Sequence, residues 1–215
     1  LTGIQGGGGA GINKVSSGGI NYSDNWGKKI DITASYFFNE GNNTSEQQTR
    51  RKYVLASDSG QVYNEVSNNN NRNYNHRFSL RLNYNIDSFN SILIMPQLSL
   101  QRNYANTSLT ANTIQGDTQL NAMANTSSAN TLGYNFSNNL LFRHRFRKER
   151  RTFSLNINTS DNHSNGVSYL NSQNIFNTDT TLNTRLDQRA MSYQNTWALS
   201  GNITYTEPIG KKGMV

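Results

Sequence analysis

Apolar and polar residues alternate along several stretches of the chain. In residues 30–38 the apolar set is Ile30, Ile32, Ala34, Tyr36 and Phe38, with Asp31, Thr33 and Ser35 between them. Six further stretches alternate in the same way: residues 19–23, 76–86, 91–101, 134–146, 152–158 and 197–205. A period of two indicates β-strands with one apolar and one wet face, and helical spacing is nowhere sustained. We therefore expect an all-β, antiparallel chain.

The connections between these stretches alternate in length. Short turns are expected at residues 25–28, 87–90, 147–151 and 207–212, and long polar loops at residues 39–75, 103–133 and 159–195. Short turns at one end and long loops at the other are typical of an up-and-down transmembrane β-barrel of the outer membrane, with periplasmic turns and extracellular loops. The sequence predicts a fragment of about seven or eight strands, with two open edges.

The phase of the alternation assigns each side chain to a face. The residues expected to face lipid are Ile30, Ile32, Tyr36, Phe78, Leu80, Leu82, Leu98, Leu100, Phe136, Leu140, Phe142, Phe153, Leu155, Ile157, Trp197, Leu199 and Ile203. The lumen-facing candidates are Arg77, Arg81, Arg143 and Arg145. Aromatic residues near strand ends suit the two interfacial girdles of a barrel: Trp26, Tyr36, Phe38, Phe89, Tyr134, Phe146, Trp197 and Tyr205.

Composition narrows the fold class. Only 33% of the 215 residues are hydrophobic, which is little for a soluble core, whereas a single-layer sheet needs one apolar residue in two. An aromatic content of 10% argues against disorder. There is no Cys, so disulfides and thiolate chemistry are excluded. The net charge is +7, but the cations lie in or beside short turns, so we expect no nucleic-acid partner.

Two short motifs are weak candidates for chemistry. Asp161-Asn162-His163 lies in an expected loop and combines an acid with a base, but one such pair in an Asn-rich loop does not define a catalytic or metal site. Gly6–Gly9 lacks the Lys-Ser/Thr and the helix of a phosphate loop, so we expect a linker. We accordingly expect no enzyme activity, no metal and no cofactor.

Several segments resemble a known family. They are Gly18–Tyr22, the turn Asn25–Lys29, the strand end Ser35–Asn39 and the turn Glu207–Lys211. They resemble the barrel region of the TonB-dependent-receptor-type outer-membrane proteins of Bacteroidota, whose members often carry a carboxypeptidase-regulatory-like domain and a plug before the barrel. The resemblance extends over most of the chain, but these specific segments cover only the first forty or so residues and the last turn.

This resemblance implies a location in the outer membrane and import of a nutrient, namely a glycan, a peptide or a metal chelate. Residues 1–17 would link the plug to the barrel, and residues 18–215 would form part of the barrel. The implied partners are outer-membrane lipid, the remaining barrel and plug, TonB and a surface lipoprotein. Neither a plug nor a TonB-contact segment is visible in the sequence, and complete barrels of this family have many more strands. We therefore interpret the chain as an internal fragment of a longer protein.

Two other classes of function remain open. A soluble β-sandwich also alternates, so a secreted or surface adhesin that binds carbohydrate through Asn- and Tyr-rich loops is one alternative. An outer-membrane hydrolase is the other. Three long connections on one side favour the barrel over the sandwich, in which loops are usually short at both ends. The substrate is not specified by the sequence.

Overall fold

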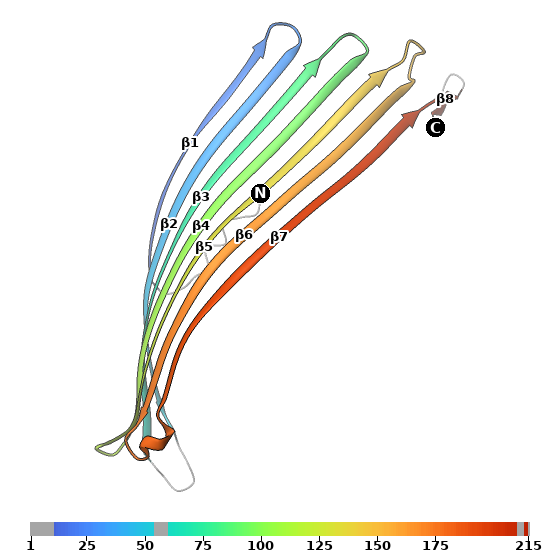
Figure 1. Ribbon diagram of the computed structural model, residues 1–215. Coiled ribbons are helices and arrows are strands. Elements are labelled where there is room, and N and C mark those ends of the chain that lie inside the picture. Colours follow the sequence, from blue (N-terminus) through green and yellow to red (C-terminus); the bar gives the residue numbers. More distant parts are fainter. Residues whose placement is uncertain (1–10, 54–59, 210–212, 215) are drawn as a thin grey trace.

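The computed structural model describes residues 11–53, 60–209 and 213–214, and its chain is almost entirely β-strand (Figure 1). The strands and the single 3₁₀-helix η1 follow one another along the chain. Their bounds are β1 Ile12–Trp26, β2 Ile30–Lys52, β3 Gln61–Asn85, β4 Asn90–Gln115, β5 Thr118–Arg145, β6 Thr152–Phe176, η1 Thr180–Leu182, β7 Thr184–Thr206, β8 Pro208–Ile209 and β9 Gly213–Met214.

Strands β1 to β7 form one sheet in chain order, and every neighbouring pair is antiparallel. The predicted all-β, up-and-down meander is confirmed. In the described part of the chain, β1 and β7 are the two edges of the sheet and do not pair with each other. Strands β8 and β9 form a separate two-stranded hairpin.

Three of the predicted short turns lie together at one end of the sheet, which we call the short-turn end (Figure 1). They occupy residues 27–29, 86–89 and 146–151, and Gly27 takes the left-handed conformation with φ of 69°. Asp87 shapes the second turn, because its Oδ1 accepts the backbone N–H groups of Phe89 at 2.7 Å and Asn90 at 2.8 Å. The fourth predicted turn falls partly on residues 210–212, outside the described residues.

The three predicted long loops are wrong in their extent. Strands β2 to β6 are 23 to 28 residues long, so most of each polar stretch is strand. At the opposite end, the hairpin-tip end, β4 and β5 are joined by Gly116 and Asp117 alone, with Gly116 at φ of 57°. Residues that are polar on both faces still form strands, because every residue except proline carries a backbone N–H donor and a C=O acceptor for pairing with the next strand.

The first strand is longer than predicted at both ends. It was expected at residues 19–23 but runs from Ile12 to Trp26, so residues 12–17 belong to β1 and not to the expected linker. The remaining linker, including Gly6–Gly9, lies largely outside the described residues.

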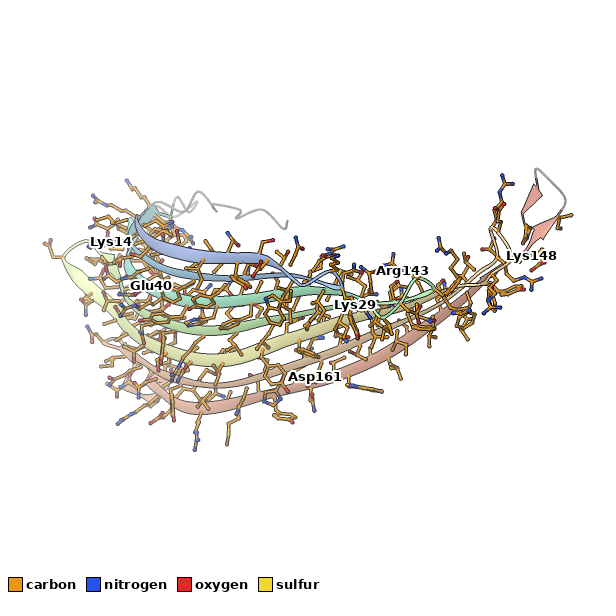
Figure 2. All side chains as sticks on the ribbon, turned by 90° about the horizontal axis from the view of Figure 1, so that it is seen from above. Lys14, Lys29, Glu40, Arg143, Lys148 and Asp161 are labelled. Atoms are coloured by element: carbon orange, nitrogen blue, oxygen red, sulfur yellow. The ribbon has the colours of Figure 1, made fainter. Side chains whose placement is uncertain are left out.

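Within the described residues, no second layer covers the seven-stranded sheet. Side chains project from both faces of a single curved sheet, with Lys14 and Lys148 near its opposite ends (Figure 2). Among the described residues only Ile32 and Ala111 are buried apolar side chains, at 9% and 7% exposure. A soluble domain of this length would bury many large apolar side chains, so the fold is incompatible with the sandwich considered from the sequence.

Candidate functional site

One face of the sheet, the apolar face, collects every side chain predicted to face lipid. The register shows this row by row: Ile32 lies opposite Leu82, which lies opposite Ile94, which lies opposite Leu140. The same row continues through Ile157 to Gly201. Since consecutive side chains of a strand point to opposite faces, the alternation in each strand is in phase with its neighbours.

These rows form an apolar band. From Phe142 to Tyr134 it is about 27 Å tall along the strand at roughly 3.4 Å per residue, and its seven strands make it about 29 Å wide at roughly 4.8 Å per strand. It is interrupted in β1 by Asp24, which lies opposite Ile32, and in β5 and β6 by Asn138, Thr159 and Asp161. The Asn138 Oδ1 atom is buried without a partner. Such a patch is larger than the apolar patches that soluble monomers usually expose.

Aromatic and basic residues border the band at the short-turn end. The Phe146 ring packs edge-on against Tyr205 with centroids 6.1 Å apart, and the Arg151 guanidinium lies 5.9 Å from the Phe146 centroid. Trp26 donates its Nε1–H to the Tyr22 hydroxyl at 3.2 Å. These residues present an apolar body and a polar tip, the combination found at membrane–water boundaries.

A second aromatic border crosses the sheet about ten residues further along the strands from the first border. Phe38 lies opposite His76, and two strands further Tyr134 lies opposite His163. The His76 ring packs against Phe38 at 4.9 Å and its Nδ1 bonds the Tyr36 hydroxyl at 2.9 Å. Of the expected girdle residues, Trp26, Phe146 and Tyr205 lie in the first border, and Tyr36, Phe38, Tyr134 and Trp197 lie in or beside the second. Phe89 lies instead beside Arg145, on the side of the polar face.

A lattice of arginine and tyrosine lies just beyond this second border. The tripeptide Arg-Asn-Tyr occurs at residues 72–74 in β3 and 102–104 in β4, and the antiparallel register places Arg72 opposite Tyr104 and Tyr74 opposite Arg102. Each guanidinium lies over the tyrosine of its own strand, at 5.2 Å and 4.7 Å from the ring centroids. Arg72 also forms an ion pair with Glu40 at 2.6 Å. Sequence analysis missed this lattice because it falls in stretches interpreted as loops.

The opposite face, the polar face, carries all four predicted lumen-facing arginines. The register places Arg77 opposite Phe37 and Ser99, and Arg81 opposite Thr33. Arg143 donates from Nη2 to the Asn83 Oδ1 at 3.2 Å, and Asn83 donates to the Asp31 carboxylate at 3.1 Å. Arg145 donates to the Ser88 carbonyl at 3.0 Å.

Positive charge dominates this part of the polar face. The described strands place four cations here, Arg77, Arg81, Arg143 and Arg145, and at the same height Asp31 is the only carboxylate that they place on this face. In the described part of the chain, none of these cations forms an ion pair, since the ion pairs there are those of Glu40 and Glu207. The polar face therefore favours anions over cations.

Amides and hydroxyls bridge the strands across the rest of the polar face. Asn103 donates to Asn71 at 2.9 Å, Gln101 to Asn73 at 3.2 Å and Ser99 to Asn75 at 3.2 Å. Two adjoining hollows lie among these bridges. One, of about 470 Å³, is lined by Ser35, Phe37, Arg77, Phe78, Ser79, Gln97, Leu98, Ser99 and Asn135. The other, of about 420 Å³, surrounds Gly133.

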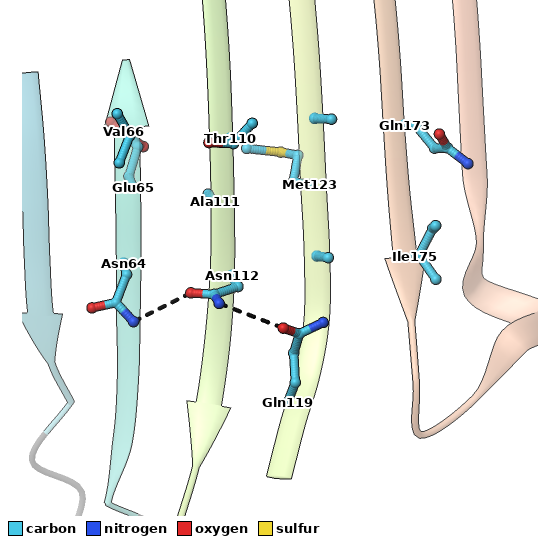
Figure 3. Close-up of a pocket in the computed structure, with 12 residues that line it drawn as sticks. Asn64, Glu65, Val66, Thr110, Ala111, Asn112, Gln119, Met123, Gln173 and Ile175 are labelled. Atoms are coloured by element: carbon cyan, nitrogen blue, oxygen red, sulfur yellow. Dashed lines mark hydrogen bonds between the residues drawn. The ribbon is translucent and has the colours of Figure 1, made fainter. Parts of the chain in front are cut away.

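A third hollow, of about 540 Å³, lies near the hairpin-tip end on the continuation of the apolar face (Figure 3). Small residues such as Ala122 and Ala124 leave the space, and a chain of amides borders it. Asn64 donates to Asn112 at 3.2 Å and Asn112 to Gln119 at 3.5 Å. This hollow is lined by neutral amides and apolar groups, with Glu65 as its one charged lining residue.

At the short-turn end, Glu207 joins the end of β7 to the turn between β5 and β6. Its carboxylate accepts from Lys148 Nζ at 2.5 Å, Arg151 Nε at 2.6 Å and the Tyr205 hydroxyl at 2.8 Å. The hydrogen bond from Arg151, followed by those from Lys148 and Tyr205, holds the pKa of Glu207 well below its usual range.

The residues that the sequence offered as weak candidates for chemistry lie within the sheet. Asp161 and His163 lie in β6 and not in a loop, and both point to the apolar face. Asp161 accepts a hydrogen bond from the Tyr134 hydroxyl at 2.8 Å, and His163 stacks on the Tyr134 ring with centroids 5.5 Å apart. Within residues 11–53, 60–209 and 213–214, three or more acidic or histidine side chains nowhere gather as metal ligands would.

Sequence analysis also missed Phe37, which the register places on the polar face opposite Arg77. The signal was present, because Phe37 breaks the alternation between Tyr36 and Phe38.

Among the described residues no helix is both long enough and apolar enough to cross a membrane. Neither known family models nor curated proteins match the chain.

Proposed function

We propose that this sheet is part of the wall of a transmembrane β-barrel in a bacterial outer membrane. The supporting observation is the apolar band, bordered by two aromatic rows on one face while the other face is covered with amides, hydroxyls and arginines. In a membrane barrel, lipid covers the outward face and water fills the lumen. Lipid would supply the apolar environment that the single layer does not provide for itself.

The dimensions support the same proposal. A strand of about 9–11 residues crosses the bilayer when tilted, and the outward apolar zone of such barrels is about 25 Å tall. The band is about 27 Å along the strand, or about 20 Å after a tilt of roughly 40°. Strands of 23 to 28 residues would then extend beyond the membrane at the hairpin-tip end. That end is the extracellular one under this proposal.

We further propose that the complete barrel imports a nutrient, as in the TonB-dependent-receptor-type proteins that the sequence resembles. The polar face would line the passage, and the extended hairpins would meet the substrate first. Its partners would be outer-membrane lipid, a plug, TonB and a surface lipoprotein. This chain would contribute binding and selection and no catalytic step.

Fractionation of cells that express the protein tests the location. We expect it in the outer-membrane fraction, released only by detergent, because the exposed band would otherwise aggregate in water. Recovery as a soluble monomer without detergent would contradict the proposal. It would favour the surface adhesin, for which the amide-bordered hollow of Figure 3 is the supporting feature.

A further inference from the structure

Phe37 is an aromatic side chain on a face that is otherwise polar. It is 42% exposed, and its direct neighbours in the adjoining strands are Gly19 of β1 and Arg77 of β3. A Cβ atom at Gly19 would come within 3.0 Å of the Phe37 ring, so the glycine leaves the ring its space. At the height of the apolar band, the described strands place no other aromatic residue on the polar face.

Arg77 places a positive charge beside this ring. The Arg77 side chain is exposed, and no carboxylate lies within ion-pair distance of it in the described part of the chain. Arg143 and Arg145 of this face differ, because Arg143 bonds Asn83 and Arg145 bonds the Ser88 carbonyl. Arg81 resembles Arg77 in its charge and face, but it does not line the hollow that contains Phe37. A free guanidinium presents paired donors that match a carboxylate.

Neutral hydrogen-bonding side chains, together with Phe78 and Leu98, complete the hollow around Phe37 and Arg77. Ser35 and Ser79 share a hydrogen bond of 2.5 Å on one side, and Gln97 and Asn135 lie on the other. The hollow of about 470 Å³ is of the size that small-molecule sites have. On the surrounding face the described strands place four arginines against one carboxylate, so an anion is favoured as it approaches.

We propose that this hollow binds small organic carboxylates that carry an apolar ring, the carboxylate on Arg77 and the ring against Phe37. This site goes beyond the proposed transport function. It rests on that function in one respect, namely that the polar face lines the passage. The ring contact excludes simple inorganic anions as the best ligands, and the guanidinium excludes neutral aromatic compounds.

Titration calorimetry of the purified protein in detergent tests the site, with benzoate as the probe and benzamide as its neutral analogue. We expect benzoate to bind at least about tenfold more tightly than benzamide, because only benzoate makes a charge-assisted pair. Arg77→Gln should weaken benzoate binding about tenfold or more. Phe37→Ala should weaken it severalfold and should not change the preference for benzoate over benzamide.

Arg81→Gln is the matched control, since it removes the same charge from the same face and strand. It should leave benzoate binding within about twofold. Equal losses in the two arginine variants, or no benzoate binding by the unaltered protein, would overturn the proposal. If Arg77→Gln does not fold by circular dichroism, Phe37→Ala carries the test, and unchanged binding in that variant overturns the proposal. Because the assay needs no membrane, its failure and a failure of the membrane proposal are distinguishable.

Discussion

Arg102 of β4 lies over the ring of Tyr104, 4.7 Å from its centroid, and the same arrangement recurs in β3 between Arg72 and Tyr74. The antiparallel register brings the two units together, so that the Tyr74 and Tyr104 rings meet edge-on at 6.3 Å. Under the proposed membrane location, such an arginine would keep its charge in the headgroup region while its stem covers apolar surface.

A double-mutant cycle on this unit has a defined outcome. We expect Arg102→Gln and Tyr104→Ala to couple by about 0.5–1 kcal/mol, the strength of an exposed cation–π contact. Urea unfolding of the protein in lipid vesicles measures the coupling. A second cycle, Arg77→Gln with Tyr104→Ala, joins residues on opposite faces and should show no coupling. The same value in both cycles would contradict the contact.

The assignment of faces predicts unequal costs for neighbouring arginine substitutions. Ile94 points to the apolar face and Leu93 to the polar face. Ile94→Arg should lower the free energy of unfolding in lipid by about 2–4 kcal/mol if its row lies near the midplane. Leu93→Arg should cost less than about 1 kcal/mol, because water reaches that side chain in a barrel lumen. Equal costs in the same unfolding assay would show that the faces are wrongly assigned.

The Glu207 cluster predicts a pH dependence at the short-turn end. The folded-state pKa of Glu207 lies below its unfolded value of about 4.3. The ionised Glu207 carboxylate therefore stabilises the fold fully above the unfolded pKa, and this stabilisation is lost as pH falls through the folded pKa. The protection factors of amide exchange at residues 146–151, which correct for the intrinsic pH dependence of exchange, should therefore fall between pH 6 and pH 3. Glu207→Gln should exchange faster already at pH 6 and lose most of this pH dependence. Glu149→Gln, in the same turn, should behave as the unaltered protein; if it mimics Glu207→Gln, the cluster is not the cause.

The sequence predicted the sheet well where the apolar band lies and poorly beyond it. Ile30–Phe38 and Thr152–Asn158 alternate because one face is apolar and the other wet, and both are strands. In residues 68–73, five asparagines and one arginine give no alternation, because both faces of β3 are polar there. These residues are held by backbone pairing and amide bridges, which hydrophobic patterning does not detect.

The candidate site was predicted only in part, for a related reason. The four arginines followed from the phase of the alternation, and the register places all of them on one face. Phe37 and the Arg-Asn-Tyr lattice depend on which residues of different strands meet. A single sequence gives no direct signal of that register, which the turns and the whole set of strand pairs determine together.

The proposed sidedness is testable with single cysteines, since the protein has none of its own. A cysteine at Asp117 or Thr181, at the hairpin-tip end, should react with an impermeant maleimide on intact cells. A cysteine at Ser88 or Glu149, at the short-turn end, should react only after the outer membrane is opened. Labelling of both pairs on intact cells would contradict the topology.

The central claim is that the apolar face contacts lipid, and quenching by brominated lipid tests it most directly. Leu140 and Leu141 are adjacent, of the same residue type, and point to the apolar and polar faces respectively. In a background in which Trp26 and Trp197 are replaced by Phe, Leu140→Trp and Leu141→Trp each provide one fluorophore at the same depth. The account predicts strong quenching at position 140 by lipids brominated on their acyl chains and little at position 141, where aqueous iodide or acrylamide should quench instead. Equal quenching at both positions, or none at position 140, would contradict it.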